Sequence, residues 1–342
     1  MLAEALKKIK VGHPRTFAGL SVYPLIGVAG ASPGDAAYTV LDDALGKGTA
    51  RITEVSDSGS VPELAFENDG DRPVLILDGE ELVGAKQNRI VNLTILAPAK
   101  SKVVIPVSCV EAGRWRSMSR EFKGSPQVMY ARARAGKAES VSYCMSIDGT
   151  HTSDQSKVWD DIGRKQRELK STSPTSRMTD TFEDRGAELD DYVSNLPRVE
   201  GQVGAVFALA GKVSCVELFD SAETLEKMWP KLVRSWALDA LSISNRPHDV
   251  RPVAEAQALI DEVAAAKPAE HKALGLGKDL RFGGGRLNGG ALMHDDALVH
   301  LCVFRDASRD DDRGRRRDER GDDNDWTGWR PGRMTSASRR NR

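Results

Sequence analysis

The sequence lacks the features that mark several protein classes. Its four cysteines, at positions 109, 144, 215 and 302, are widely spaced, and no CxxC pair or Cys/His cluster has the spacing of a zinc site. Such cysteines are typical of reduced thiols in a cytosolic protein. Lysine and arginine number 49 against 50 aspartate and glutamate, so no net field attracts nucleic acid or an anionic membrane. We therefore predict no metal site and no nucleic-acid partner.

Long apolar runs are also absent. No run approaches the ~18 residues that a membrane-spanning helix requires. The first ten residues, MLAEALKKIK, lack the apolar core of a secretory signal and are typical of a short amphipathic helix. We expect a cytoplasmic protein without a membrane partner.

Familiar catalytic and cofactor motifs are missing as well. The segments GLGKDL and GGGRLNGG fit neither a P-loop nor a dinucleotide-binding fingerprint, and GxSxG, HExxH and HxH do not occur. We expect these glycines to form tight turns between strands, with an anion-binding nest supported by Arg281 or Arg286 as the alternative. The spacing of His294 and His300 matches no standard metal site, so we predict no cofactor.

The order of the patterns predicts an α+β fold, with a β-sandwich or barrel-like core and packed helices. Residues 16–116 are rich in short strands separated by turns, and residues 117–198 are polar and helical. Residues 199–305 predict a β-hairpin, helices and closing strands, and we take residues 1–305 as one domain. Residues 306–342 hold 11 arginines and 9 acidic residues with almost no aliphatic side chains, which predicts a disordered charged tail.

Helix boundaries carry their own signals. The segment TDTFEDRGAELDDYVSNL predicts a helix with Thr179 or Asp180 as its N-cap, and SKVWDDIGRKQRELKS predicts another. Ser221 is a suitable N-cap for a third helix. Pro230 interrupts that helical pattern, so we expect a kink or two short helices there.

One stretch, LDGEELVGAKQNRIVN, concentrates polar groups between two apolar runs. On a regular strand, alternation places Glu81, Gln87 and Arg89 on one face and keeps Lys86 and Asn88 on the other. Amide side chains suit a ribose hydroxyl or a base edge, and an arginine suits phosphate or carboxylate. The mix favours binding of a polar small molecule.

A second stretch, IPVSCVEAGRWRS, places Cys109, Glu111 and Trp115 on one face of a strand, with Arg114 just beyond. One interpretation is a polar pocket floor, with Cys109 as a reactive thiol activated by a positive neighbour such as Arg89. The other is a packed cysteine beside a structural ion pair. The sequence leaves both open.

These stretches, together with YTVLDDAL, KVWDDI and RFGGGRLNGGALMHDDALVHLCVF, resemble the ARG and Rhodanese-Phosphatase-superfamily-associated protein family, where ARG means ADP-ribosylglycohydrolase. The resemblance runs from about residue 16 to 305. It implies a system that handles NAD-derived or ADP-ribosylated molecules, with an ADP-ribosylglycohydrolase or a phosphatase-like protein as a partner. The matching motif positions are Glu81, Lys86, Gln87, Asn88, Arg89, Cys109, Glu111, Arg114 and Trp115.

From the residues and the resemblance, we expect binding or hydrolytic processing of an ADP-ribose-like or other NAD- or nucleotide-derived small molecule. Glu81 and Glu111 are the candidate catalytic groups. A non-enzymatic interaction or scaffold protein and a metal-dependent hydrolase are the alternatives. The candidate ligand-binding residues are Lys86, Gln87, Asn88, Arg89, Arg114, Trp115 and Arg281.

Overall fold

Antiparallel sheet dominates the structure. The computed structural model describes residues 1–27, 36–56, 62–114, 119–243 and 249–306. Within these residues, nine strands form a large sheet in the order β1-β3-β13-β14-β18-β17-β16-β15, with β2 paired to β3. The strands are β1 (Ile9–Val11), β2 (Arg15–Phe17), β3 (Leu20–Gly27), β13 (Gln202–Leu209), β14 (Lys212–Phe219), β15 (Ala269–Lys272), β16 (Lys278–Phe282), β17 (Leu287–His294) and β18 (Ala297–Arg305).

Five strands of the predicted β-rich region, residues 16–116, join β12 in a closed barrel with the order β11-β6-β5-β12-β8-β9. Apolar side chains at alternate positions, such as Ile52, Phe66 and Ile105, fill its interior, as the two-residue period of a strand requires. A small sheet, β10-β7-β4, adjoins it. The strands are β4 (Thr39–Val40), β5 (Ala50–Glu54), β6 (Glu63–Asn68), β7 (Val74–Ile76), β8 (Glu80–Gly84), β9 (Arg89–Val91), β10 (Ile95–Ala97), β11 (Ser101–Cys109) and β12 (Glu121–Val128).

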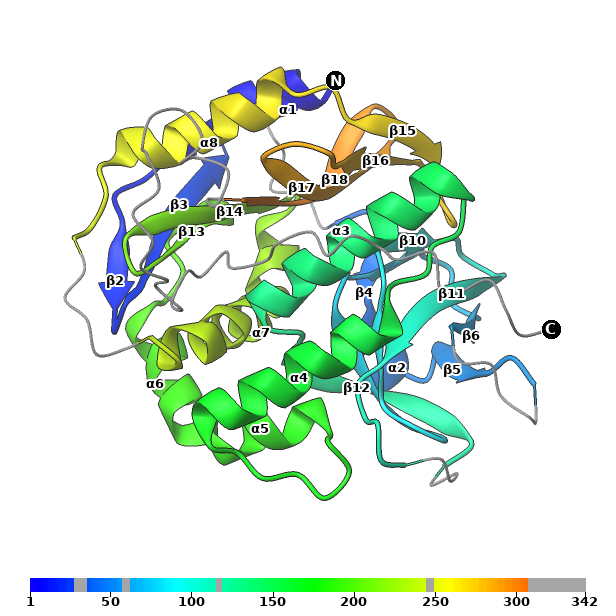
Figure 1. The fold of residues 1–342 in the computed structure, drawn as a ribbon. Coiled ribbons are helices and arrows are strands. Elements are labelled where there is room, and N and C mark those ends of the chain that lie inside the picture. Colours follow the sequence, from blue (N-terminus) through cyan, green and yellow to red (C-terminus); the bar gives the residue numbers. More distant parts are fainter. Residues whose placement is uncertain (28–35, 57–61, 115–118, 244–248, 307–342) are drawn as a thin grey trace.

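Helices cover both faces of the large sheet (Figure 1). Helices α1 (Leu2–Lys7) and α8 (Val253–Ala265) pack on one face, and α7 (Ala222–Leu241) and α3 (Ala131–Ile147) lie on the other. The central strand β13 is buried along its whole length. Phe207 from that strand stacks on Trp236 of α7 with ring centroids 4.9 Å apart. Because helices cover both faces of the large sheet, the side chains on both sides of β13 are buried, and the strand is a nearly continuous apolar run.

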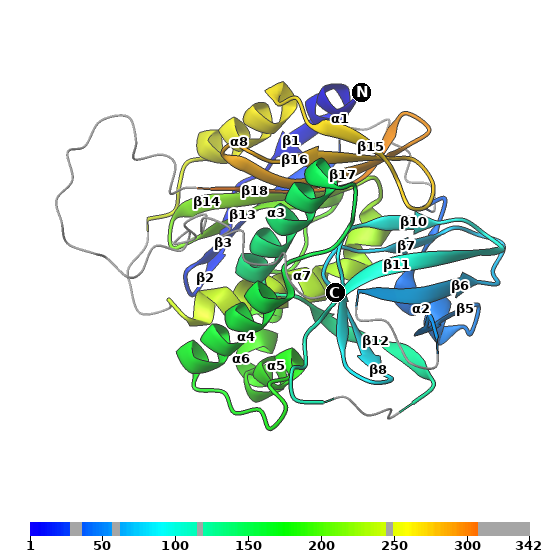
Figure 2. The same ribbon diagram turned by 45° about the vertical axis from the view of Figure 1, so that its right-hand side comes forward.

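The view turned by 45° shows the barrel strands beside α3 and α7, below the large sheet (Figure 2). Helices α4 (Gln155–Leu169), α5 (Met178–Asp184) and α6 (Gly186–Asn195) continue this layer, and α2 (Leu41–Gly46) packs against the barrel. Asp154 caps α4 by accepting hydrogen bonds from the backbone N–H groups of Ser156 and Lys157. The large sheet and the barrel thus meet across α3 and the segments next to β7 and β8.

The expected α+β class with a barrel-like core is confirmed, and several local predictions are corrected. Ser221 does cap α7, and because that helix includes Pro230 as one element, the expectation of two short helices is wrong. The predicted helix near Thr179 is split into α5 and α6, and α5 has Arg177 as its N-cap. Strand β12 lies at the start of residues 117–198, which were expected to be helical, and helix α3 lies in the same region but was not singled out as a helix. The predicted disordered tail falls almost wholly on residues 307–342, outside the described residues. Within the described part of the chain, no helix combines the length and apolar character needed to cross a membrane.

Candidate functional site

The first predicted stretch is not one strand. Strand β8 ends at Gly84, β9 begins at Arg89, and residues 85–88 turn the chain between them. Gly84 and Ala85 adopt left-handed backbone φ angles of 139° and 38°. The turn breaks the alternation on which the facing prediction depended. As a result, the Asn88 side chain reaches Glu81, which the strand pattern had placed on the opposite face.

Glu81 is fully enclosed by neutral hydrogen-bond donors. The Thr179 hydroxyl donates to Oε1, the Ser125 hydroxyl donates to Oε2 at 2.8 Å, and Asn88 Nδ2 donates to Oε1 at 3.4 Å. Burial raises the pKa of Glu81 above its ordinary value, and these three hydrogen bonds oppose that rise. A carboxyl group with a raised pKa is suited to proton transfer in chemical terms, but it also packs as a neutral acid.

Glu111 has the opposite environment, because it lies against an arginine. Arg114 Nη2 lies 2.7 Å from Oε2, the backbone N–H of Asn88 donates to the same oxygen at 3.2 Å, and the Thr175 hydroxyl donates to Oε1 at 3.0 Å. Burial acts to raise the pKa of Glu111, but these donors outweigh it and hold the pKa below its ordinary value. This carboxylate is therefore kept charged by its ion pair.

Arg89 connects the two predicted stretches in the barrel. Its Nη1 donates to Gln87 Oε1 at 2.8 Å and lies 2.7 Å from Cys109 Sγ. Gln87 Nε2 in turn donates to the carbonyl of Glu111 at 2.8 Å. Burial raises the pKa of the Cys109 thiol, and the positive charge of Arg89 only partly offsets this effect.

Most of the predicted site residues therefore contact one another, in what we call the barrel network. Lys86 is half-buried at the turn, Trp115 lies outside the described residues, and Arg281 lies on β16 in the large sheet. Whether this network binds or processes a ligand stays a prediction. Its members are Glu81, Gln87, Asn88, Arg89, Cys109, Glu111 and Arg114.

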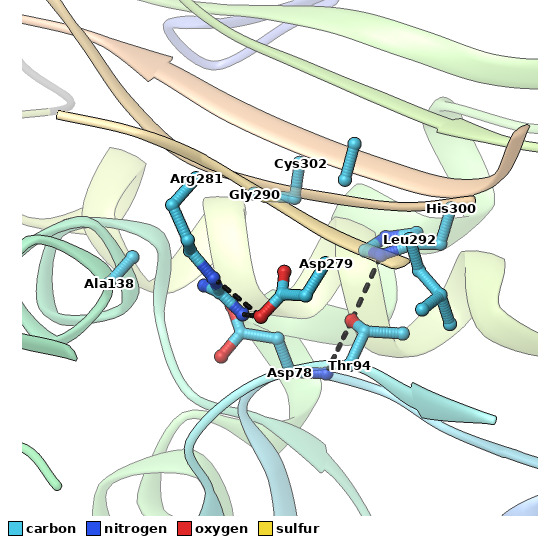
Figure 3. Close-up of a pocket in the computed structure, with 10 residues that line it drawn as sticks. Asp78, Thr94, Ala138, Asp279, Arg281, Gly290, Leu292, His300 and Cys302 are labelled. Carbon is cyan, nitrogen blue, oxygen red and sulfur yellow. Dashed lines mark hydrogen bonds and ion pairs between the residues drawn. The ribbon is translucent and has the colours of Figure 1, made fainter. Parts of the chain in front are cut away.

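A second cluster of charged groups surrounds a small cavity between the barrel and the large sheet, which we call the chamber (Figure 3). Its volume of about 20 Å³ is enough for one water molecule. Asp78 and Thr94 come from the barrel side, and the large sheet contributes Asp279, Arg281 and His300. The further lining residues are Ala138, Gly290, Ala291, Leu292 and Cys302.

A chain of contacts runs from one side of the chamber to the other. The Thr94 hydroxyl accepts a hydrogen bond from the backbone N–H of Asp78 at 3.1 Å and lies 3.0 Å from His300 Nδ1 (Figure 3). His300 Nε2 lies 3.4 Å from Glu217 Oε1. Arg134 of α3 donates to both oxygens of Glu217, at 2.9 and 3.2 Å, and its Nε lies 3.7 Å from Asp78 Oδ2. The ring of contacts therefore closes back on Asp78.

Because these side chains are buried, the charged form of each depends on the charge of its partner. Burial alone raises the pKa of Glu217, but Arg134 reverses this and lowers it to about 2. Lys137, one turn along α3 from Arg134, donates to Asp78 and to the carbonyls of Val91 and Asn92. Burial still lowers the pKa of Lys137 below its ordinary value, although Asp78 acts in the other direction.

A much larger groove of about 1280 Å³ lies next to the chamber. Arg281 lines both cavities, and within the chamber Asp279 Oδ2 accepts its Nε and Nη2 hydrogens at 2.9 and 2.8 Å. The β16–β17 turn with Gly283–Gly285 and Arg286 forms one wall of the groove, and α3, the start of α4 and the end of α8 form the rest. This groove is large enough for a small molecule, whereas the chamber is not.

Comparison with known proteins gives one match. A family model described as the ARG and Rhodanese-Phosphatase-superfamily-associated Protein domain, ARPP-1, matches residues 8–304. The chain belongs to this family. The match includes all the strands of the large sheet from β1 to β18 and the whole barrel, so the ARPP-1 domain is the fold described above. No curated protein and no solved structure matches the chain.

The ARPP-1 family name links the chain to a system associated with ADP-ribosylglycohydrolases and the rhodanese-phosphatase superfamily, and it specifies neither a ligand nor a reaction. Sequence reasoning found Arg281 but missed the rest of the chamber. Two signals were present: Glu217 and His300 are polar residues inside the apolar strand runs VSCVELF and ALVHLCVF. A charged side chain inside such a run requires a buried partner, and Arg134 is that partner.

Proposed function

We propose that this ARPP-1 domain binds a phosphate-bearing small molecule, of the ADP-ribose-like or other nucleotide-derived class, in the groove between α3 and the β16–β17 turn. The observation that carries the proposal is the groove itself, in which a glycine-rich turn and two arginines lie on one wall. A ligand bound at this wall would contact Arg281, which also lines the chamber.

The β16–β17 turn has the properties of a phosphate-binding backbone. Gly284 has a φ angle of 74°, and a side chain added at Gly284 or Gly285 would meet no atom within 4 Å. A ligand can therefore approach the peptide N–H groups of this turn closely, which is how backbone nests hold anions. Arg281 and Arg286 lie on either side of the turn, and a guanidinium group binds phosphate oxygens through paired N–H donors.

The remaining walls suit the rest of a nucleotide. Tyr143, 47% exposed, offers an aromatic surface for a base, and Pro268 and Ala266 add apolar contact. The carboxylates of Glu139 and Glu262 also line the groove, and carboxylates accept hydrogen bonds from ribose hydroxyls. A nucleotide-derived ligand has a base for the aromatic surface and ribose hydroxyls for the carboxylates.

Hydrolytic processing is the finer part of the proposal. It requires a water molecule and a proton acceptor beside the bound ligand. The chamber has the volume of about one water molecule, and Asp279 lines it while holding Arg281 of the groove wall. Glu81 and Glu111 in the barrel network remain the alternative acid–base groups.

The proposal is tested by calorimetric titration of the full chain with ADP-ribose, NAD, AMP and inorganic phosphate. We expect at least one nucleotide to bind, and Arg286→Gln to weaken it about tenfold or more, because a charge-assisted contact to phosphate is lost. Arg51→Gln is the matched control, since Arg51 is similarly exposed but lies on the barrel. The absence of binding by any of the four compounds at millimolar concentration contradicts the proposal.

The same titration discriminates between the two clusters. If Arg114→Gln abolishes binding and leaves the melting temperature unchanged, the ligand occupies the barrel network instead of the groove. If Arg114→Gln lowers the melting temperature and spares binding, the barrel network is structural. Product formation, followed by chromatography of each incubated compound, separates binding from hydrolysis.

A non-enzymatic interaction is the second candidate, favoured by the association in the family name and by an open sheet edge. Strand β15 ends the large sheet, and among the described strands its partner is β16 alone. An unpaired edge is a site where a segment of another protein adds as a further strand. Size-exclusion chromatography with a purified ADP-ribosylglycohydrolase tests this candidate: co-elution supports it, and separate elution at micromolar concentration counts against it.

A further inference from the structure

Two of the four cysteines lie side by side in the core. Cys215 on β14 and Cys302 on β18 have their sulfur atoms 4.0 Å apart. In the register of these neighbouring strands, Cys302 lies opposite Glu217 and Cys215 opposite Phe304, so the two thiols are diagonal neighbours on one face of the sheet. No other pair of sulfur atoms in the described residues makes such a contact.

The two thiols differ in their surroundings. Cys302 lines the chamber, and Arg134 Nη2 lies 3.5 Å from its sulfur atom. Cys215 is fully buried, and burial raises the pKa of its thiol. Cys302 therefore has two features of an attacking thiol, a place in the lining of the chamber and a guanidinium group beside its sulfur atom, and Cys215 lies where a second, resolving thiol is required.

The chamber also limits the oxidant that reaches Cys302. Its volume of about 20 Å³ excludes glutathione disulfide, and hydrogen peroxide is the thiol oxidant closest to water in size. Polar groups such as Asp279 and His300 line the same space and offer hydrogen bonds to a peroxide.

We propose that Cys302 and Cys215 form a peroxide-oxidised dithiol site. The Cys302 thiolate attacks one oxygen of hydrogen peroxide, the O–O bond breaks, and the departing hydroxide takes a proton to become water. Cys302 is then a sulfenic acid. The Cys215 sulfur attacks the Cys302 sulfur, the S–O bond breaks, and the hydroxyl group leaves as a second water with the Cys215 proton. One peroxide is reduced and two thiols become one disulfide.

Disulfide formation brings the sulfur atoms from 4.0 Å to ~2.05 Å. Diagonal neighbours on adjacent antiparallel strands lie ~7–8 Å apart, so the bond requires β14 and β18 to draw together at this point as well as a side-chain rotation. Cys302 moves toward Cys215 and away from Arg134, which changes the wall of the chamber. The disulfide would lie between β14 and β18, two central strands of the large sheet, where both cysteines are buried.

The barrel supplies a matched comparison. Cys109 is also buried and also lies against an arginine, with Arg89 Nη1 at 2.7 Å, but no second cysteine contacts it in the described residues. Peroxide oxidation of Cys109 therefore forms no disulfide within the folded chain. Cys144, which is half-buried, reports the reactivity of an ordinary accessible thiol.

The test treats the folded full chain with stoichiometric hydrogen peroxide, blocks the remaining thiols and maps the peptides by non-reducing mass spectrometry. We expect one cross-linked pair joining VSCVELFDSAETLEK to LNGGALMHDDALVHLCVFR, two hydrogens lighter than the sum of the two peptides. Both thiols disappear together, about tenfold faster than Cys109, and dithiothreitol restores them.

Single variants fix the roles. Cys215→Ser leaves a Cys302 sulfenic acid that a dimedone probe captures, Cys302→Ser leaves Cys215 unmodified, and Cys109→Ser leaves the cross-link unchanged. The proposal is overturned if the folded protein oxidises at Cys144 or Cys109 while Cys302 stays reduced. It is equally overturned if the cross-link forms only in urea, because the thiols then meet only in the unfolded chain.

Discussion

The barrel network and the chamber are both buried clusters of acids and arginines, but they differ in how the chain builds them. The core of the barrel network comes from residues 81–114, with Ser125, Thr175 and Thr179 added. The chamber and its supporting charges come from β14, β16, β18, α3 and the segments beside β7 and β10. The first cluster is visible as a motif in the sequence, and the second exists only after the sheet and the barrel have met.

The two clusters also differ in what surrounds them. Side chains of the barrel network bond to one another and to nearby backbone, as Gln87 does with Arg89 and with the Glu111 carbonyl. The chamber retains space and shares Arg281 with the groove as a lining residue. A dense polar motif therefore indicates a well-ordered turn as readily as a ligand site, and residual space next to buried charge is the stronger indication of function.

The substitution that should lower the free energy of unfolding most removes Arg134, which holds the charges around the chamber. Arg134→Met leaves Glu217 and Asp78 without their shared buried partner, so we expect the free energy of unfolding to fall by about 3–5 kcal/mol. Urea unfolding followed by circular dichroism measures the change. The double variant Arg134→Met with Glu217→Gln should lose less than the sum of the two single losses, because it removes both charges of the pair. Additive losses would show that the two residues act independently.

The pH dependence of the free energy of unfolding tests the charge state of Glu217 beside the chamber. The pKa of Glu217 is lowered from 4.5 to about 2, so the unfolded state binds the proton more readily than the folded state. Its contribution, on the order of 3 kcal/mol, is present above pH ~4.5 and is lost as the pH falls toward ~2. Urea unfolding at several pH values should show this loss in the native chain and not in Glu217→Gln. A Glu217→Gln curve parallel to that of the native chain contradicts the assignment.

A smaller effect separates the two glutamates of the barrel network. Glu111→Gln replaces the charged partner of buried Arg114 with a neutral amide, so we expect a loss of about 1–3 kcal/mol at pH 7. Glu81→Gln replaces a carboxyl group whose pKa is raised by burial with a neutral amide, so we expect a change of less than about 1 kcal/mol. Thermal unfolding of both variants at pH 7 measures the difference. Equal losses would mean that the two environments do not differ as the hydrogen bonds indicate.

Local patterns predicted much of the fold. Alternation identified β3 and the barrel strands within residues 16–116 but not β12, and the glycines identified the β16–β17–β18 hairpins. Helix α3 was missed because its residues, ARARAGKAESVSYCMSI, have no apolar stripe of helical period. The buried residues of α3 include Arg134 and Lys137. Their burial depends on acidic partners that lie elsewhere in the chain, Glu217 for Arg134 and Asp78 for Lys137.

The candidate site was less predictable for the same physical reason. The turn between β8 and β9 brought Asn88 to Glu81, against the strand alternation, because the positive φ angles of Gly84 and Ala85 end the regular strand there. Pro230 remained within α7 because extensive packing of that helix against β13 compensates for one missing backbone hydrogen bond. Pairs such as Thr94 and His300, 206 residues apart, are set by tertiary contact alone.

The dispersion of the chamber along the sequence has a kinetic consequence. Asp78, Arg134, Glu217 and His300 meet only after the long chain segments between them have closed, and closing such loops costs entropy before any contact rewards it. We expect these ion pairs to form after the transition state for folding. Weakening them should then accelerate unfolding while leaving the refolding rate nearly unchanged. The lifetime of the native state, more than the speed at which it is reached, therefore depends on this ring.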